Sequence, residues 1–218
     1  MQCKVLNFFR RHIISESNDI FIEAALTWSE LTQYNYTLTY GYKAGLRKVT
    51  ITFLPSHFPH LAGFQYLHDI HLPRYFPKQI MDKIIKGKLK YSTISKSINF
   101  EKLVKPRLEA LIQLKTILDN DFSLFAYTPQ HYPFRTSIKA DFLISSRVNS
   151  TNYVFVIQSA TLNQQEDNYL CCSAFTKGDR NYEANQRKRT LLKKERIHLP
   201  TNTNTILYDK LIEQKNSV

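Results

Sequence analysis

Strand-like and helix-like patterns occupy separate stretches of this chain, and this separation constrains its fold more than any other feature. Residues 36–42 and 49–53 alternate with a period of two, and the short segment between them contains Gly45, which is typical of a hairpin. Further strand candidates follow one another at residues 122–127, 140–145, 153–158 and 169–173. Helices grouped between antiparallel strands are typical of the α+β class. We therefore expect a single domain, with an antiparallel sheet of about five or six strands and helices packed on it.

Apolar side chains recur at helical spacing in most of the remaining stretches. The first expected helix has Asp19 as a suitable N-cap, another ends at Gly87, and the long amphipathic helix begins at Pro106. The expected helices cover residues 19–33, 60–70, 78–86, 106–118 and 182–197. The chain is thus divided into an N-terminal extension, a folded domain and a polar C-terminal tail, expected at residues 1–18, 19–200 and 201–218.

The composition is that of a globular protein with a strong excess of positive charge. Hydrophobic residues make up 43% of the 218 residues, which is enough for one substantial core and argues against a disordered chain. Lysine and arginine total 30 against 18 acidic residues, so the formal net charge is +12. An excess of this size favours a polyanionic partner. Nucleic acid is the leading expectation, ahead of an anionic membrane surface or an acidic protein.

Cysteine usage and hydropathy point away from disulfides, zinc and membrane segments. Cys3, Cys171 and Cys172 form an odd set with an adjacent pair, and no spacing of cysteine and histidine resembles a zinc site. The sequence contains no run of about 18 apolar residues, and its first residues lack an apolar run followed by a cleavage site. We therefore expect no cofactor, no membrane partner and a cytoplasmic location.

Two histidines lie at a corner where a strand leads into a helix, between residues 53 and 64. An imidazole can transfer a proton near neutral pH, and connections at strand ends often carry binding and catalytic groups. His60 lies near the start of the expected helix, where backbone N–H groups favour a phosphate; the alternative is that its ring packs under Phe58 and Leu61. His57 has the weaker claim, because it can instead belong to the helix cap.

Cationic residues are further candidates for phosphate contacts. Arg107, which follows Pro106, is either a phosphate clamp or a structural ion-pair partner. Alternation places Ser137, Lys139 and Asp141 on one face of a strand, and that face is either solvated or lines a cleft. The basic segment that ends the domain is either a solvated surface or an electrostatic footprint for RNA. Its cations are Arg180, Arg187, Lys188, Arg189, Lys193, Lys194 and Arg196.

Five short motifs follow one another along the chain. They are F-x-x-x-x-F-x-H-L-x-G, an arginine in a long helix, S-x-x-A-D, S-x-F and Y-x-x-x-Q. Their residues are Phe53, Phe58, His60, Leu61, Gly63, Arg107, Ser137, Ala140, Asp141, Ser173, Phe175, Tyr182 and Gln186. In this order the motifs resemble the fourth group of phage-associated barnase–EndoU–colicin–RelE-like nucleases, over roughly residues 20 to 196. The chain departs from that pattern at Thr176, where the family often has a second aromatic residue.

The resemblance implies a compact antiparallel sheet covered by helices and a metal-independent ribonuclease activity in a prophage or toxin setting. In such a reaction the ribose 2′-OH attacks the adjacent phosphate, with proton transfer and charge neutralisation by the protein. We expect His60 to transfer protons, and Arg107 and Lys139 to neutralise the phosphate. Ser173, Tyr182 and Gln186 are expected to position the phosphate or a base. The remaining expected substrate contacts are His57, Ser137, Thr176, Arg187 and Arg189.

RNA is therefore the expected partner, with an acidic antitoxin or immunity protein as a second one. Two alternatives stay open at this point. One is a catalytically inactive RNA- or DNA-binding module of the same fold, which would use the same basic surface. The other is a phage accessory protein whose positive charge meets an acidic protein.

Overall fold

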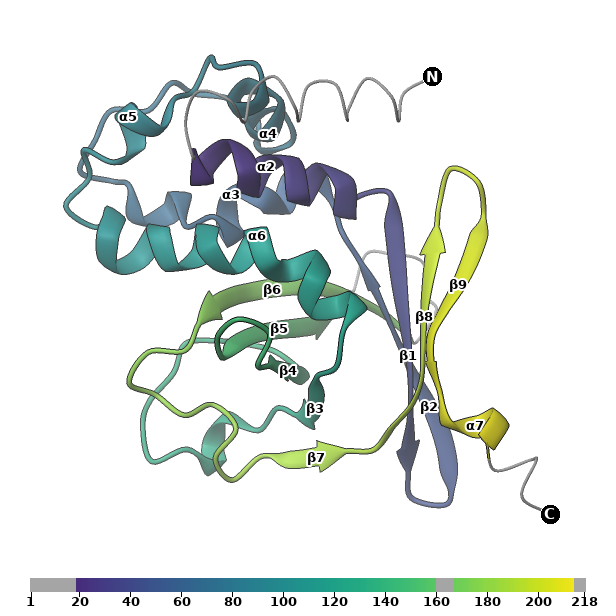
Figure 1. The fold of residues 1–218 in the computed structure, drawn as a ribbon. Helices are drawn as coiled ribbons and strands as arrows, with labels where there is room; N and C mark the ends of the chain where they lie inside the picture. Colours follow the sequence, from purple (N-terminus) through teal and green to yellow (C-terminus); the bar gives the residue numbers. More distant parts are fainter. Residues whose placement is uncertain (1–18, 160–166, 214–218) are drawn as a thin grey trace.

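A computed structural model describes residues 19–159 and 167–213 of the chain. Within these residues nine strands form one curled, mixed sheet, and helices α2 to α6 gather on one side of it (Figure 1). The helices are α2 (Ile20–Leu31), α3 (Phe58–Leu61), α4 (Pro77–Ile85), α5 (Tyr91–Ile94), α6 (Lys105–Asp119) and α7 (Lys210–Glu213). The strands are β1 (Tyr34–Tyr42), β2 (Gly45–Thr52), β3 (Ser123–Ala126), β4 (Phe142–Ser146), β5 (Asn152–Gln158), β6 (Asn168–Thr176), β7 (Arg187–Arg189), β8 (Leu191–His198) and β9 (Thr203–Asp209).

The predicted antiparallel sheet of about five or six strands is wrong in both strand number and direction. The order across the sheet is β7-β3-β4-β5-β6-β2-β1-β8-β9, and β2 pairs with β6 in parallel, from Thr50 opposite Asn168 to Thr52 opposite Leu170. This parallel joint connects two halves whose own strands pair antiparallel. A period-two pattern marks a strand but carries no information about its partner or direction, so the joint has no local signal.

The basic segment that was expected to form a helix over residues 182–197 contains strands β7 and β8 instead. Its lysine, arginine, leucine and glutamate residues favour a helix by intrinsic propensity. In the fold, however, β8 pairs on one side with β1 and on the other with β9. Lys194 at its centre is 2% exposed, and its Nζ donates to the carbonyl of Asn120. Residues 203–209, expected in a polar tail, form the edge strand β9.

Most other elements confirm the sequence pattern. The N-cap of α2 is Asp19, whose Oδ1 accepts the Phe21 N–H at 2.9 Å, and β1 and β2 form the expected hairpin. Strands β3 to β6 and helices α4 and α6 match their predicted segments within a few residues. The helix expected over residues 60–70 ends early, because α3 is followed by Gly63 in a left-handed conformation with φ of 87°. No described helix is both long enough and apolar enough to cross a bilayer.

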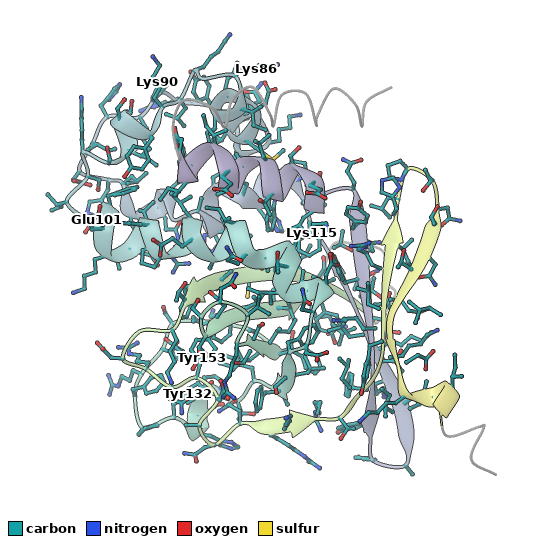
Figure 2. The ribbon with its side chains drawn as sticks, viewed as in Figure 1. Lys86, Lys90, Glu101, Lys115, Tyr132 and Tyr153 are labelled. Carbon is teal, nitrogen blue, oxygen red and sulfur yellow. The ribbon has the colours of Figure 1, made fainter. Side chains whose placement is uncertain are left out.

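Apolar side chains form two cores, one on each face of the sheet. Alternate residues of β5 divide between them: Val154 and Val156 join the main core under the helices, whereas Tyr153 and Phe155 join a smaller aromatic core. Figure 2 shows Tyr153 on the side away from the helix layer. Two loops, residues 127–141 and 177–186, cover this smaller core, and they bring their polar residues to the start of α6.

The far end of α6 is fixed to the sheet by a charged network around Asp119. This carboxylate accepts hydrogen bonds from Tyr36 Oη at 2.7 Å, Lys115 Nζ at 2.9 Å and Arg196 Nη1 at 2.6 Å. Burial alone would raise the pKa of Asp119, but the bonds from Lys115 and Tyr36 hold that pKa below its ordinary value. The helix is thus anchored to β1 and β8 at its C-terminal end, while its first turn faces the loops.

Candidate active site

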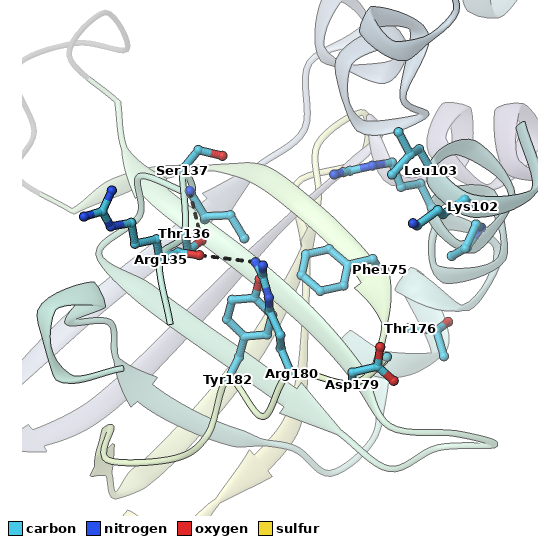
Figure 3. Close-up of a pocket in the computed structure, with 14 residues that line it drawn as sticks. Lys102, Leu103, Arg135, Thr136, Ser137, Phe175, Thr176, Asp179, Arg180 and Tyr182 are labelled. Carbon is cyan, nitrogen blue, oxygen red and sulfur yellow. Dashed lines mark hydrogen bonds between the residues drawn. The ribbon is translucent and has the colours of Figure 1, made fainter. Parts of the chain in front are cut away.

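A cavity of about 740 Å³ opens between the start of α6, the end of β6 and the loops that follow β3 and β6. Figure 3 shows Lys102 and Leu103 facing Arg135 and Thr136 across a shared space, with Phe175 between them. The lining residues are Lys102, Leu103, Pro106, Arg107, Arg135, Thr136, Ser137, Ile138, Phe175, Thr176, Gly178, Asp179, Arg180 and Tyr182. Four of these side chains are cationic and one is a carboxylate, so the cavity favours an anion.

Arg107 is held in the cavity wall by neutral partners. Its Nη1 donates to Ser173 Oγ at 3.3 Å and its Nη2 donates to Tyr66 Oη at 3.2 Å. Its Cζ lies 5.2 Å from the centre of the Tyr66 ring and 5.8 Å from that of Phe175. No carboxylate of the described residues forms an ion pair with it. The guanidinium is therefore oriented while its charge stays uncompensated.

Two local features of the backbone place this arginine. Pro106 lies in the first turn of α6, where the missing N–H is tolerated, so Arg107 projects from the beginning of the helix. Gly63 lies against the arginine stem: a Cβ at this position would be 3.0 Å from Arg107 Cδ and 3.4 Å from the carbonyl oxygen of Leu103. Glycine is therefore required here both by its positive φ and by the close approach of α6.

The opposite wall of the cavity is tied together by Arg180 and Tyr182. Arg180 Nη1 donates to the carbonyl of Arg135 at 3.3 Å, and its Cζ lies 5.2 Å from the Phe134 ring centre. Tyr182 is buried in the aromatic core, and its carbonyl accepts the Tyr132 hydroxyl at 2.7 Å. Its ring centre lies 5.5 Å from that of Phe175. These contacts join the loops after β3 and β6 into one aromatic surface. Arg180 lies against its Phe134 ring and Arg107 against its Phe175 ring.

The structure brings five of the predicted site residues together. Arg107, Ser137, Thr176 and Tyr182 line the cavity, and Ser173 reaches it through its bond to Arg107. The Thr176 hydroxyl, at the departure from the family pattern, donates to Asn152 Oδ1 at 3.1 Å. Residues from a helix, a strand and two loops thus meet within one concavity.

The other predicted site residues lie outside this lining. His60 is exposed on α3, while His57 is half-buried, and burial lowers the pKa of His57, with His60 lowering it further. Lys139 is exposed on the same loop as Ser137 but does not line the cavity. The Gln186 amide bonds both backbone groups of Thr128, at 2.6 Å and 3.1 Å, which joins the two loops. The remaining two, Arg187 and Arg189, lie on β7 at the end of the sheet.

Several cavity residues were missed by sequence reasoning. Tyr66 follows the F-x-x-x-x-F-x-H-L-x-G motif by only three positions, so a longer motif would have included it. Arg180 was counted only as part of a basic segment, and Lys102 and Arg135 carry no local signal at all. Arg135 and Arg180 reach the cavity because the loops after β3 and β6 fold back toward α6, and Lys102 faces them from the helical turn Phe100–Val104 that precedes α6. No cluster of three or more histidine, cysteine, aspartate or glutamate side chains suited to a metal occurs in the described part of the chain.

Comparison with known proteins adds one finding. A family model described as phage-Barnase-EndoU-ColicinE5/D-RelE like nuclease4 matches residues 20–211. The match covers both halves of the sheet, α2 to α6 and every lining residue of the cavity. Neither the curated proteins nor the solved structures yielded a match to this chain.

Proposed function

Because the chain belongs to the phage-Barnase-EndoU-ColicinE5/D-RelE like nuclease family over residues 20–211, we propose that it is an endoribonuclease and that the cavity holds the phosphate to be cleaved. One observation carries the assignment of the site. Arg107 is oriented by two hydroxyl groups and two rings and has no acidic partner among the described residues. An arginine built for structure alone is usually paired with a carboxylate, whereas this one is left for an external anion.

The proposed reaction is attack of a ribose 2′-OH on the adjacent phosphorus. A base removes the 2′ proton, the new P–O bond forms, and the bond to the 5′-oxygen breaks as that oxygen receives a proton. The products are a 2′,3′-cyclic phosphate and a free 5′-OH. Negative charge on the phosphate oxygens rises in the transition state, and protein cations stabilise it without a metal ion.

Two hydroxyl groups beside Arg107 can help to stabilise the negative charge on the phosphate oxygens. Ser173 and Tyr66 each accept a hydrogen bond from Arg107, and no described residue accepts the hydrogen of either hydroxyl. Both hydroxyls are therefore able to donate to a phosphate oxygen beside the guanidinium. Donors that are already oriented stabilise a transition state without a reorganisation cost. Lys102 and Arg180 line the same cavity and extend the positive field to neighbouring phosphates.

Two groups are our candidates for proton transfer. Asp179 lines the cavity and forms no ion pair within the described residues. His60 lies three residues before Gly63, the glycine that packs against Arg107, and it is exposed. We propose that Asp179 accepts the 2′ proton and that His60 serves the leaving oxygen at the rim. Because His57 is half-buried whereas His60 is exposed, the loss of His57 should affect cleavage less than the loss of either group.

A non-catalytic RNA-binding module is the second candidate, and one observation favours it: no histidine of the described residues lines the cavity. In either case we propose a phage-linked role, with a toxin-type nuclease favoured by the family. An acidic antitoxin would complement the +12 net charge.

Cleavage of a 5′-labelled single-stranded RNA in EDTA tests the proposed function. We expect fragments that end in a 2′,3′-cyclic phosphate, and no cleavage of a DNA strand of the same sequence, because DNA lacks the attacking hydroxyl. Asp179→Asn and His60→Asn should each lower kcat by about 10²- to 10⁴-fold, the usual contribution of a proton-transfer group. His57→Asn is the matched control, with an expected loss below about tenfold.

Absence of cleavage across RNAs of varied sequence, with RNA binding retained, would establish the binding module instead. Equal cleavage of the DNA strand would exclude attack by the 2′-OH. Full activity of both Asp179→Asn and His60→Asn would remove these two groups from the reaction while leaving the phosphate site at Arg107 to be tested separately.

A further inference from the structure

A second group of cations lies around β7 and the β1–β2 turn, and none of them lines the cavity. We call it the β7 patch and define it by its cationic side chains: Lys43, Arg47, Arg187, Lys188 and Arg189. They come from the β1–β2 turn, the first part of β2 and the whole of β7. In Figure 1 β7 and the β1–β2 turn lie together at the bottom of the molecule, on the side opposite α4.

The patch is held together by contacts with two tyrosine rings of β1. Arg189 Cζ lies 4.8 Å from the Tyr42 ring centre and 5.9 Å from that of Tyr40. Lys43 Nζ lies 5.5 Å from the Tyr42 ring centre, and Arg47 is the cross-strand partner of Tyr40. Arg189 Nε is buried and has no hydrogen-bond partner among the described residues. Four of the five cations are exposed, and Tyr42 between them is half-buried.

These cations lack acidic partners among the described residues, unlike Lys193 and Arg196 of β8, the next strand along the chain. Lys193 pairs with Glu195 at 2.8 Å, and Arg196 pairs with Asp119 at 2.6 Å. No member of the β7 patch forms an ion pair with a described residue. Five cations on adjoining segments without acidic partners repel one another, and an external polyanion relieves that repulsion.

We propose that the β7 patch is a second binding site for the substrate strand, one that contacts phosphates outside the cavity and stacks an unpaired base on Tyr42. The partner is single-stranded RNA, so this inference rests on the proposed function. Exposed arginine and lysine contact the backbone without sequence preference, and an aromatic ring beside them accepts any base. The cavity then positions the cleaved phosphate, while the β7 patch increases affinity for strands long enough to reach both sites.

The test compares binding of 2′-O-methyl RNA of 15 and of 4 nucleotides in EDTA, by fluorescence anisotropy over a series of salt concentrations. These strands lack a 2′-OH and cannot be cleaved by the proposed reaction, so binding is measured whether or not the protein is an enzyme. The variant Arg187→Gln/Lys188→Gln removes two exposed charges. The matched control Lys78→Gln/Lys88→Gln removes two exposed charges at α4 and the turn after it.

For the 15-mer, we expect the log–log salt slope to fall in magnitude by about 1.4, because each phosphate contact with a single strand contributes about 0.7. If the variant and the wild type bind equally at 1 M salt, this difference in slope makes the affinity of the variant about 25-fold weaker at 0.1 M salt. The control should bind as the wild type does, and the 4-mer should bind both variants equally. Unchanged thermal midpoints would establish that the fold is intact.

An unaltered slope for Arg187→Gln/Lys188→Gln would overturn the proposal and leave the patch to a different class of partner, such as an acidic protein. Equal losses in both double variants would also overturn it, since net charge alone would then explain the effect. An equal loss for the 4-mer and the 15-mer would place these residues at the cavity instead. A wild type that binds as expected but cleaves no RNA would contradict the proposed function and leave the β7 patch supported.

Discussion

Arg107 and Arg196 illustrate two uses of the same side chain in one protein. Arg196 is bonded to Asp119 and serves to attach α6 to the sheet. Arg107 is bonded only to hydroxyl groups, so a phosphate can approach it without first displacing a carboxylate. Its sequence context made an ion pair and a phosphate clamp equally plausible. The two uses are distinguished only by the neutral surroundings of Arg107, which come from two segments far from it in the sequence, Tyr66 and strand β6.

Gly63→Ala tests whether the position of Arg107 matters for activity. Both Gly63 and Gly87 have positive φ, so alanine at either should reduce the free energy of unfolding by roughly 1–2 kcal/mol. Only at Gly63 would the added Cβ meet Arg107 Cδ, at 3.0 Å, whereas nothing lies within 4 Å of a Cβ at Gly87. We expect kcat/KM for RNA cleavage to fall at least about tenfold in Gly63→Ala and to change little in Gly87→Ala.

Urea unfolding of both variants, run beside the cleavage assay, separates stability from activity. Similar cleavage rates for the two alanine variants would mean that a small displacement of Arg107 has no effect on the reaction.

Among the elements, β8 shows why a charged sequence can mislead. Its residues favour a helix by propensity, yet β1 and β9 supply hydrogen bonds along both of its edges. Lys194 is compatible with this buried position because its ammonium Nζ lies 4.8 Å from the Phe122 ring centre and bonds the Asn120 carbonyl. Helix α6, in contrast, was predictable from its own residues, since its apolar positions recur at helical spacing and Pro106 marks its first turn.

Asp119→Asn tests the anchor of α6. Removing one charge from this partly buried network leaves Lys115 and Arg196 without their shared partner, so the free energy of unfolding at pH 7 should fall by roughly 3 kcal/mol. Because the pKa of Asp119 is lowered in the folded protein, its contribution is present above the ordinary value of 3.8 and is lost as the pH falls through the lowered pKa. The difference from the wild type should therefore narrow in acid.

Urea unfolding at a series of pH values measures this effect. Asp82→Asn is the matched control, because Asp82 is an exposed residue paired with Lys86 on the surface of α4 and should contribute little. A pH-independent difference between the wild type and Asp119→Asn would contradict the role given to the ionised carboxylate.

At the scale of the whole molecule, local sequence patterns predicted individual strands and helices but not how they pair and pack. The hairpin, the four central strands and the long helix follow from period and capping residues. The parallel joint between β2 and β6 depends on segments more than a hundred residues apart, and no local signal reports it. The same limit applies to the site: Arg107, Ser173 and Tyr182 were found through motifs, whereas Lys102 and Arg135 are brought together only by tertiary folding, from the turn before α6 and from the loop after β3.

The cleavage rate of Arg107→Lys tests the central claim most directly. Lysine keeps the charge but cannot contact two phosphate oxygens through a planar, oriented group. Under single-turnover conditions with saturating protein, we predict a rate at least about 100-fold below that of the wild type, in the range seen when one transition-state donor is lost. Arg74→Lys, on the exposed segment before α4, should cleave at the wild-type rate. An Arg107→Lys variant that cleaves RNA within about threefold of the wild type would contradict the assignment of this cavity as the active site.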